Sequence, residues 1–461
     1  MKIADQIAMS KMSGLQIRAA ILAIVLVILD GYDLVVITFT APHVRQEFGV
    51  SASLMGWVLS GALIGMFLGS TFVAPLADRI GRRNVAILAT LTVTVGMIIG
   101  LLARDISVML VSRVVTGIGI GMLLATTGVI LAEYTNKRIY TPAMGFLSAG
   151  PNLGATIGAA LVGPLMSTAT VTTMAYPFGG WRFAFLVGAG LALITLLATV
   201  FWCPESITWL AEGRRPGALG RLNTLLAKMG QPVLAELPAP EAPDVHQKGA
   251  LRTIFSPGLR WKTLLMIIGY VAYQVTFYFM NTWSPSVISG SNALPTGAPN
   301  TALAAPTTMS ISLGGMLGMA LFGFIAYKVN PRVLTTVFVI LGFVTLAAFA
   351  VTGTHVPMAF VMLAIASFFF SAGNTGFYTV VPKLYPTLAR ATGYGMVAGI
   401  GRIGGMAAPI LGGMAFDAHL SVKVVYMMFG APLLLTGICM LILHIGMKRT
   451  GADHAMEPAA T

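Results

Sequence analysis

The chain alternates between long apolar segments and shorter polar ones. An α-helix needs about 20 predominantly apolar residues to cross the hydrocarbon core of a bilayer. About twelve windows reach this length. They cover residues 18–42, 53–77, 84–103, 107–132, 140–166, 182–203, 261–289, 305–327, 333–353, 356–382, 391–416 and 421–446. The pattern predicts an all-α membrane protein with twelve transmembrane helices.

A longer polar stretch divides the predicted helices into two groups of six. It is rich in Pro, Glu and Arg and includes "ELPAPEAPDVHQKG". A short helix is expected within it, around "PGALGRLNTLLAKMG". We therefore predict a six-helix bundle over residues 1–203, a cytoplasmic linker over 204–260, and a second six-helix bundle with a short cytoplasmic tail over 261–461.

The composition agrees with this architecture. Of the 461 residues, 56% are hydrophobic and 9% are charged, whereas a soluble domain usually carries about 25% charged residues. No globular core could bury so much apolar surface, which excludes a water-soluble protein. The net charge of +13 does not indicate a nucleic-acid partner, because the positive residues fall in short runs between the apolar windows.

The positive residues define an orientation. With both termini in the cytoplasm, about 22 of the 28 Lys and Arg residues fall on the cytoplasmic side. Those outside are Arg45, Arg104, Arg182 and Lys423, and those within helices are Arg113 and Arg402. Cytoplasmic loops of membrane proteins carry an excess of Lys and Arg, and the opposite orientation would invert the asymmetry. The sequence therefore predicts cytoplasmic N- and C-termini.

The two halves of the chain resemble each other at an offset of roughly 250 residues. "APLADRIGRR" aligns with "GFIAYKVNPR", and each joins the second and third helix of its half. "GFLSAGPNLGATIG" aligns with "GMVAGIGRIGGMAA", which sets Asn152 opposite Arg402. Many secondary transporters are built from two such repeats, with a substrate site near the bilayer midplane, and alternate access by rocking. The duplication predicts two pseudo-symmetric bundles.

Several motifs resemble those of the major facilitator superfamily. "LADRIGRR" resembles its loop motif after the second helix, "SRVVTGIGIG" its fourth-helix pattern, and "GWRFAF" and "CPESITWL" the flanks of its sixth helix. Within the superfamily, "LDGYDLVV", "LAEYTNKR" and "LARATGYGMVAGIGRIGG" are similar to the aromatic acid:proton symporters, which import benzoate-type acids into bacteria. The loop motif usually begins with Gly, and Ala74 stands there instead. The resemblance covers essentially the whole chain.

This resemblance implies a transporter with the major facilitator fold and not an enzyme. It implies proton-coupled import of benzoate or a hydroxybenzoate, by alternating access, across the bacterial inner membrane. We expect the aromatic acid, protons and the lipid bilayer as partners. We expect no cofactor, metal or nucleic acid, and we expect a monomer. Two alternatives keep the fold, namely an importer of a muconate-type dicarboxylate and a drug:proton antiporter. A passive channel or a sensor would not accumulate substrate.

Asp30 and Asp33 lie well inside the first apolar window, three residues apart and therefore on one helix face. Each costs roughly 2.5–3.5 kcal/mol on insertion at the bilayer centre. A buried carboxyl group beside a like charge can bind and release a proton near neutral pH. We therefore predict that the two aspartates couple protons to transport. The alternative is that either one caps a helix break at Gly31.

Arg402 is the cation deep within the second half. A planar guanidinium suits bidentate binding of a carboxylate, so we expect Arg402 to hold the acid group of the substrate. The alternative is a structural salt bridge to an aspartate of the first helix. Both are possible together, because Arg402 could exchange between an aspartate and the substrate.

Other charged residues are assigned through the resemblance. It implies that Arg113 and Glu133 take part in proton coupling and that Glu133 acts with Arg390 at the cytoplasmic gate. From spacing alone, Glu133 is equally a solvated acid at the membrane surface. A conformational charge latch is implied for the loop motif residues Asp78, Arg79, Gly81, Arg82 and Arg83. Ordinary topogenic positive charge would explain the arginines but not the aspartate.

An aromatic acid also requires apolar surface and a few polar contacts. Amide side chains at mid-span are costly and tend to face a cavity. The predicted substrate-binding residues, besides Arg402, are Tyr32, Asn152, Gln274, Tyr273, Tyr278, Asn374 and Phe377. Tyr270 and Tyr378 lie on the same two helices of the second half. Spacing alone does not decide which of these side chains touch the substrate.

Overall fold

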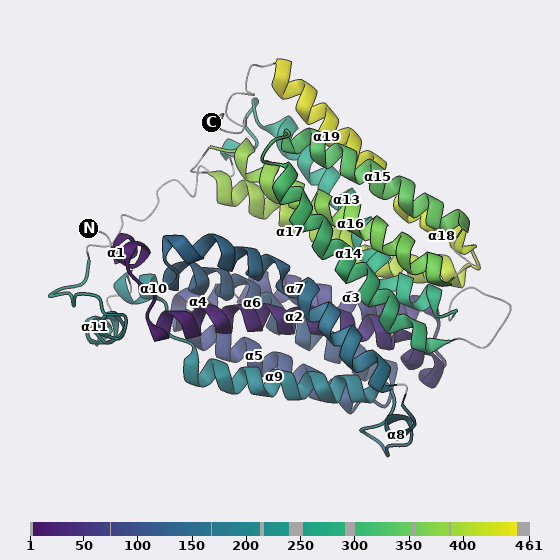
Figure 1. The fold of residues 1–461 in the computed structure, drawn as a ribbon, viewed down its shortest axis with the longest axis horizontal. Helices are drawn as coiled ribbons and strands as arrows, with labels where there is room; N and C mark the ends of the chain where they lie inside the picture. The colour runs from purple at the N-terminus through teal and green to yellow at the C-terminus, as the bar shows by residue number, and fades with distance from the viewer. Residues whose placement is uncertain are drawn as a thin grey trace. The chain divides into compact units, whose positions relative to one another are not determined.

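A computed structural model of the protein describes residues 3–73, 75–166, 168–212, 216–238, 252–290, 300–352, 356–386 and 389–449. Every regular element in these ranges is helical (Figure 1). Within the described ranges, twelve helices are long and apolar enough to cross a membrane. This confirms the predicted all-α architecture with twelve spans. Ala74 and most of the Pro-rich part of the linker lie outside the described residues.

The spans of the first half begin and end close to the predicted windows. They are α2 (Gly14–Phe48), α3 (Ala52–Leu68) with the π-helix η1 (Gly69–Val73), α5 (Arg82–Leu101), α6 (Ile106–Tyr134), α7 (Lys137–Met166) and α9 (Arg182–Trp202). The short helices are α1 (Ile3–Met9), α4 (Leu76–Ile80), α8 (Ala169–Thr172), α10 (Ile207–Glu212) and α11 (Ala218–Lys228). Helix α11 is the short helix expected in the linker.

The second half has the same number of spans. They are α13 (Arg260–Ile288), α14 (Ala304–Ile325) with the 3₁₀ turn η2 (Thr301–Leu303), α15 (Pro331–Thr352), α16 (Val356–Val380) with η3 (Val381–Leu384), α17 (Arg390–Asp417), and α18 (Val422–Gly430) followed by α19 (Pro432–Arg449). The last span divides at Pro432, because proline cannot donate the backbone hydrogen bond that a continuous helix requires.

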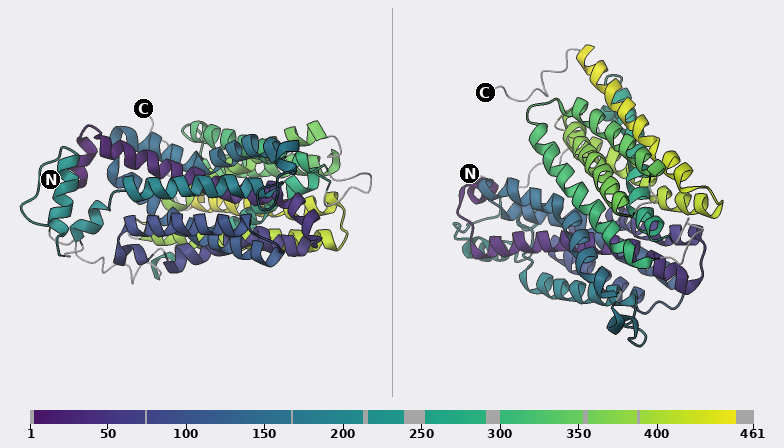
Figure 2. Two further views of the ribbon diagram at one scale, coloured as in Figure 1. Left: turned by 90° about the horizontal axis from the view of Figure 1, so that it is seen from below. Right: turned by 45° about the vertical axis from the view of Figure 1, so that its right-hand side comes forward.

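Equivalent helices pack together in the two halves. Helix α5 packs on α6 and α9, and correspondingly α15 packs on α16 and α19 (Figure 1, Figure 2). Glycines allow close approach at a second equivalent pair, since a Cβ atom at Gly65 would collide with the α6 backbone and one at Gly314 with the α16 backbone. Small residues at helix interfaces are typical of membrane bundles. The two bundles are therefore built on one packing plan.

Contacts within the chain define two compact units. The first contains Met1–Val36, Gly61–Gly158 and Leu165–Pro243, and the second contains Ile37–Ser60, Ala159–Pro164 and Asp244–Thr461. The second unit thus includes the end of α2 and the start of α3. The domain limits at residues 203 and 260 remain predictions from the sequence.

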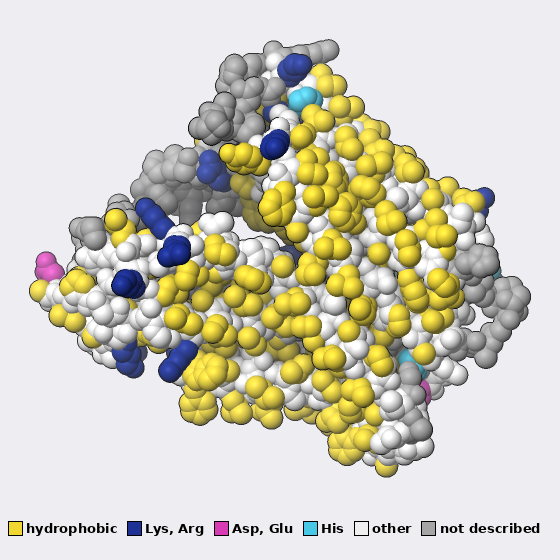
Figure 3. Space-filling model, in the orientation of Figure 1, with side chains coloured by type: hydrophobic (Ala, Val, Ile, Leu, Met, Phe, Trp, Pro, Cys, Tyr) yellow, Lys and Arg dark blue, Asp and Glu magenta, His cyan; other side chains and the backbone are white. Residues whose placement is uncertain are grey.

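The outer surface is that of a protein surrounded by lipid. Large apolar side chains are strongly exposed along the spans, with Phe324 80% and Phe201 77% exposed. On the face shown in Figure 3, apolar side chains cover much of the surface, while most Lys and Arg lie toward its left and upper margins. In water such a surface would aggregate, so the exposed rings identify the lipid-facing sides of the bundles. The chain is a multi-pass membrane protein.

Candidate functional site

Asp33 and Arg113 form a fully buried ion pair in the first unit. Nη1 of Arg113 on α6 lies 3.1 Å from Oδ1 of Asp33 on α2, and both side chains are 0% exposed. The same Nη1 donates to the Asp33 carbonyl oxygen at 3.4 Å. The guanidinium also lies over the Phe185 ring, 5.0 Å from its centroid. The structure therefore brings together two of the residues predicted to couple protons.

The hydrogen bonding of this pair is incomplete. Among the described residues, Oδ2 of Asp33 and Nε of Arg113 make no hydrogen bond. The Thr116 hydroxyl lies near the carboxylate, but it bonds to the Arg113 carbonyl oxygen at 3.1 Å. An unsatisfied oxygen on a buried carboxylate is costly, and a proton on that oxygen removes the charge. The geometry suits a carboxyl group that gains and loses a proton.

Asp30 and Tyr32 lie close to Asp33 along α2 and are also buried. Asp30 is 6% exposed. The Tyr32 hydroxyl donates to the Ala184 carbonyl oxygen of α9 at 2.6 Å, and its ring packs against Gly158 of α7. In this structure Tyr32 joins three helices, and its contact with substrate stays a prediction.

Asn152 lies where α7 approaches α2 most closely. A Cβ atom at Gly31 would collide with the backbone of Pro151, and one at Gly154 would collide with the Ile28 carbonyl oxygen. Asn152 is half-buried between these two contacts. The structure thus places this amide at the depth of the two aspartates of α2.

A layer of aromatic rings fills the space between α13 and α16 in the second unit. Tyr270 stacks on Tyr273 with ring centroids 5.9 Å apart. The ring centroids of Tyr270 and Phe377 are 4.8 Å apart. Tyr273 is 0% and Phe377 1% exposed, and the Tyr273 hydroxyl donates to the Phe370 carbonyl oxygen at 3.1 Å. In this structure these rings pack against one another. A contact of Tyr273 or Phe377 with substrate stays a prediction.

Polar groups border this aromatic layer. The Tyr270 hydroxyl donates to Oδ1 of Asn374 at 3.3 Å. Arg402 is half-buried on α17, and its neighbour Gly401 lies directly against the Tyr270 ring. The second unit therefore brings a cation and an amide, both predicted from the sequence, to one layer of rings.

Gln274 and Tyr278 occupy successive turns of α13. Gln274 is 6% exposed. Tyr278 is half-buried, with its ring against Gly405 of α17 and edge-to-face with Phe277 at 5.2 Å. Their roles as substrate ligands stay predictions.

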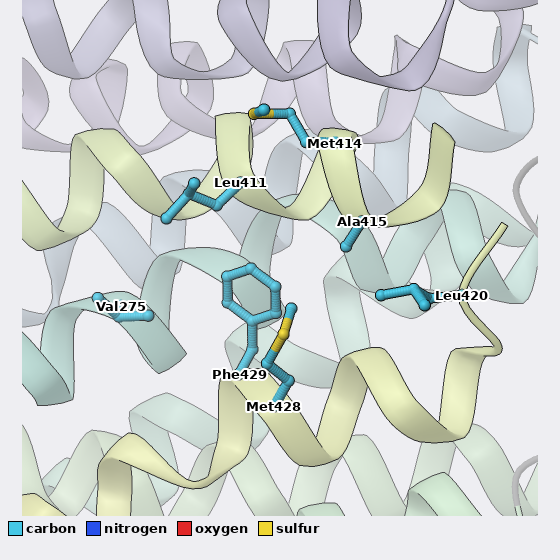
Figure 4. Close-up of a pocket in the computed structure, with 7 residues that line it drawn as sticks. All are labelled: Val275, Leu411, Met414, Ala415, Leu420, Met428 and Phe429. Carbon is cyan, nitrogen blue, oxygen red and sulfur yellow. The ribbon is translucent and has the colours of Figure 1, made fainter. Parts of the chain in front are cut away.

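An apolar cavity of ≈ 460 Å³ opens elsewhere in the second unit, between α13, α17 and α18. Figure 4 shows Phe429 and Met428 pointing from α18 toward Leu411 and Ala415 of α17. Its lining side chains are Val275, Leu411, Met414, Ala415, Leu420, Met428 and Phe429. None of them can bind a carboxylate, so we do not assign the substrate to this cavity.

The loop motif is held by the carboxylate of Glu205. Its Oε1 accepts hydrogen bonds from the backbone N–H groups of Arg82 and Arg83 at 2.8 and 3.1 Å. A carboxylate at the N-terminus of α5 satisfies free N–H groups and interacts favourably with the helix dipole. Asp78 and Arg79 of α4 are exposed beside this contact. The loop is thereby fixed to the end of the sixth span.

Glu133, at the end of α6, binds the same segment. Its carboxylate accepts hydrogen bonds from the Ser206 hydroxyl and the Ile207 backbone N–H, both at 2.8 Å. Nη1 of Arg82 lies 3.5 Å from its Oε1. Glu133 thus joins the loop motif to α10 within the first unit. Arg390 is exposed at the start of α17, and its pairing with Glu133 stays a prediction.

Glycine is the only residue type that fits position 81 of this loop without strain. Its φ of +98° with ψ of 152° is a conformation that costs other residues about 1–3 kcal/mol. A Cβ atom would also collide with the Glu205 carboxylate. Gly81→Ala is therefore expected to lower the unfolding temperature in detergent. Gly190→Ala is the control, because a Cβ there meets nothing within 4 Å, and equal unfolding temperatures would contradict the prediction.

The end of α17 binds the start of α3, and both segments belong to the second unit. Oδ1 of Asp417 accepts from the Ala52 N–H at 2.9 Å, and Oδ2 accepts from the Ser53 N–H at 2.8 Å. Further along α3, the Ser60 hydroxyl donates to the Met406 carbonyl oxygen at 2.7 Å. Asp417 thus supplies the cap that the N-terminus of α3 requires.

Comparison with known proteins identifies the family. The sequence profile of the Major Facilitator Superfamily matches residues 23–355 and 305–458. The chain belongs to the Major Facilitator Superfamily. Its fold and its relatives are those of transporters and not of enzymes.

The relatives of this transporter include carriers of aromatic acids. It is 28% identical to the gallate transporter of Pseudomonas putida, over 89% of this chain and 88% of that protein. It is also 28% identical to the 4-hydroxybenzoate transporter PcaK of Pseudomonas putida, over 85% and 84%. With the benzoate transport protein of Acinetobacter baylyi the identity is 22%, over 89% and 86%.

Solved structures share the fold of the transporter. The xylose transporter XylE from E. coli, in a partially occluded inward open conformation, matches with a TM-score of 0.69 and 17% identity over 93% of this chain and 98% of that chain. A bacterial homologue of the human lysosomal transporter Spinster, inward-facing and unoccupied, matches with a TM-score of 0.65 and 17% identity over 93% and 95%. These likenesses concern the fold alone.

Two acidic residues of the transporter have roles that sequence reasoning missed. Glu205 stands in "CPESITWL", which the sequence marks only as the end of a span, and Asp417 closes the eleventh span. The available signal is that each acid lies at the end of a helix. Such an acid can cap the N-terminus of another helix that lies close to it in space, but the sequence does not show which helix that is.

Proposed function

We propose that the transporter imports a benzoate or a hydroxybenzoate together with protons, by alternating access. The observation that carries the proposal is the Asp33–Arg113 pair, which is fully buried at 3.1 Å and keeps one carboxylate oxygen without a hydrogen bond among the described residues. Buried ionisable residues within spans are characteristic of proton relays in transporters.

The second unit supports the substrate class. Arg402 is half-buried beside the aromatic layer, and a guanidinium binds a carboxylate through two parallel hydrogen bonds. Aromatic rings supply the apolar surface that an aromatic ligand requires. The names of the relatives, which concern gallate, 4-hydroxybenzoate and benzoate, support the same class for this transporter.

Charge balance explains why a proton accompanies the substrate. In the empty transporter, Asp33 and Arg113 neutralise each other. A proton on Asp33 and a carboxylate on Arg402 together add no net charge, so the loaded and empty states cross the bilayer with equal charge. Carrying an additional net charge through the low-dielectric membrane would cost several kcal/mol. We therefore expect the anion and the proton to move in the same direction.

We propose that both termini face the cytoplasm of a bacterium, that the protein lies in the inner membrane, and that it functions as a monomer. The excess of Lys and Arg in the loops on the side of the termini supports this orientation. The loop motif then faces the cytoplasm, and the contact of Asp417 with α3 lies at the extracellular ends of the spans.

Asp417→Asn is expected to loosen the extracellular side. The amide keeps one acceptor oxygen in place of two and loses the charge that favours the start of α3. A cysteine placed at Ser60, which is 0% exposed, should react several-fold faster with a membrane-impermeant thiol reagent added outside. The native Cys203 and Cys439 are both buried. Equal labelling rates with and without the Asp417 change would contradict a stabilising role for this contact.

Uptake into proteoliposomes tests the proposed function. Labelled benzoate, 4-hydroxybenzoate and muconate should be compared with and without an inward proton gradient. We expect the gradient to drive accumulation of the two aromatic acids above equilibrium. Accumulation of muconate alone would favour the dicarboxylate importer. Gradient-driven efflux of cationic drugs without aromatic acid uptake would favour the drug antiporter, and uptake that ignores the gradient would exclude proton coupling.

A further inference from the structure

Three hydrogen-bonding side chains form a relay at the edge of the aromatic layer. The Tyr270 hydroxyl donates to Oδ1 of Asn374 at 3.3 Å, and Nδ2 of Asn374 donates to the hydroxyl oxygen of Tyr378 at 3.4 Å. Tyr270 is 5%, Asn374 8% and Tyr378 46% exposed. The relay therefore runs from the buried core of the second unit to an accessible phenol.

The two hydrogen bonds of the relay are weak. Donor–acceptor distances are most often about 2.7–2.8 Å for O–H···O and about 2.9–3.0 Å for N–H···O. Other buried hydroxyls of the second unit reach such distances, for example Tyr426 to Ser284 at 2.8 Å and Thr276 to a carbonyl oxygen at 2.6 Å. The relay is thus satisfied only loosely, and an additional polar partner can shorten its bonds at little cost.

The exposed end of the relay lies against α17, the helix that carries the predicted anion-binding residue Arg402. The rings of Tyr378 and Tyr394 are 6.0 Å apart, and Tyr394 lies within electrostatic reach of Arg402 on the same helix. Arg402 and Tyr394 are about two turns apart on α17, roughly 12 Å along the axis. One hydroxybenzoate is short enough to lie within this rise, with its carboxylate toward Arg402 and its ring hydroxyl toward Tyr394 and Tyr378.

We propose that Tyr378, positioned by Asn374 and Tyr270, hydrogen-bonds the ring hydroxyl of a hydroxybenzoate whose carboxylate is bound by Arg402. Tyr378 accepts a hydrogen bond from Asn374, and its hydroxyl can rotate to donate its own O–H to the substrate oxygen. The inference rests on the proposed function and adds that the transporter prefers hydroxylated aromatic acids to benzoate.

The chemistry of the relay sets the size of this preference. A fully buried site that binds a hydroxyl group rejects the analogue without it strongly, because its polar groups lose their partners. Tyr378 keeps the hydrogen bond from Asn374 when benzoate is bound, so its hydroxyl oxygen does not lose every partner. The preference is then the net worth of one hydrogen bond, roughly tenfold in kcat/KM.

Tyr378→Phe tests the proposal because it removes the hydroxyl and keeps the ring next to Tyr394. We expect kcat/KM for 4-hydroxybenzoate uptake into proteoliposomes to fall roughly tenfold, with kcat/KM for benzoate unchanged. Asn374→Ala should shift the ratio in the same direction, because Tyr378 loses its positioning partner. Tyr327→Phe is the matched control, since this tyrosine is 66% exposed and lies outside the relay.

The possible outcomes separate this inference from the proposed function. If the unmodified transporter carries neither aromatic acid, the proposed function fails. If it carries both, and Tyr378→Phe lowers both equally or changes neither, the proposed function stands and the hydroxyl recognition is wrong. A preference of the unmodified protein for benzoate would overturn the recognition as well. Unfolding temperatures of the variants in detergent distinguish a loss of folding from a change of specificity.

Discussion

Asp33→Asn is expected to abolish proton-driven accumulation of aromatic acid in proteoliposomes while exchange of internal for external substrate continues. Asparagine resembles the protonated carboxyl group in shape and charge, so the variant is fixed in the loaded state of the proton site. Net uptake requires release of that proton, whereas exchange does not. The measurement is uptake under an inward proton gradient compared with counterflow of labelled substrate at equal pH.

A second variant separates proton coupling from folding. Asp33→Asn leaves the guanidinium of Arg113 buried without a counter-ion, a loss of about 3–5 kcal/mol. The double variant Asp33→Asn, Arg113→Gln removes both charges, and we expect it to recover the unfolding temperature without recovering accumulation. Normal gradient-driven accumulation by well-folded Asp33→Asn would show that this carboxyl group does not carry the coupled proton.

Arg402→Lys is expected to raise KM for aromatic acids by about 10- to 100-fold, with a much smaller change in kcat. An ammonium group retains the charge but cannot form two parallel hydrogen bonds with a carboxylate. A hydrogen bond to a charged group is worth about 1.5–3 kcal/mol, and each 1.4 kcal/mol is a factor of about ten in affinity. Initial rates over a range of substrate concentrations measure both constants.

The control for Arg402 lies on the same helix. Arg390 is exposed at the start of α17, so Arg390→Lys keeps its charge in a similar setting and should leave KM nearly unchanged. If Arg402→Lys instead lowers exchange and uptake together, at an unchanged KM and with a lower unfolding temperature, Arg402 has a structural role and the substrate carboxylate binds elsewhere.

The architecture could be predicted because it depends on properties that short windows of sequence contain. The length and apolarity of each span are local, and all twelve predicted windows correspond to spans in the structure. The internal alignment also anticipated the repeated packing of equivalent helices. In lipid the backbone must satisfy its own hydrogen bonds, which leaves little choice besides helix once a segment spans the bilayer.

The partners of the charged residues could not be predicted in the same way. Asp33 and Arg113 were both identifiable as charges within spans, but their pairing depends on how α2 packs against α6. Tyr32 lies between two aspartates in sequence, yet its side chain fills a space beside Gly158 on another helix. Rotation of a helix about its axis is set by glycines on its neighbours, and single-sequence reasoning does not locate those contacts.

The contact between Asp417 and α3 has a consequence for how the protein can evolve. Its donors are main-chain N–H groups of residues 52 and 53, which every amino acid except proline provides. The main-chain part of the contact therefore does not depend on which side chain stands at position 53. Ala52 is 1% exposed and lies against Gly413, so packing restricts that position for a separate reason. A search for co-varying pairs of positions would miss the main-chain part of this connection.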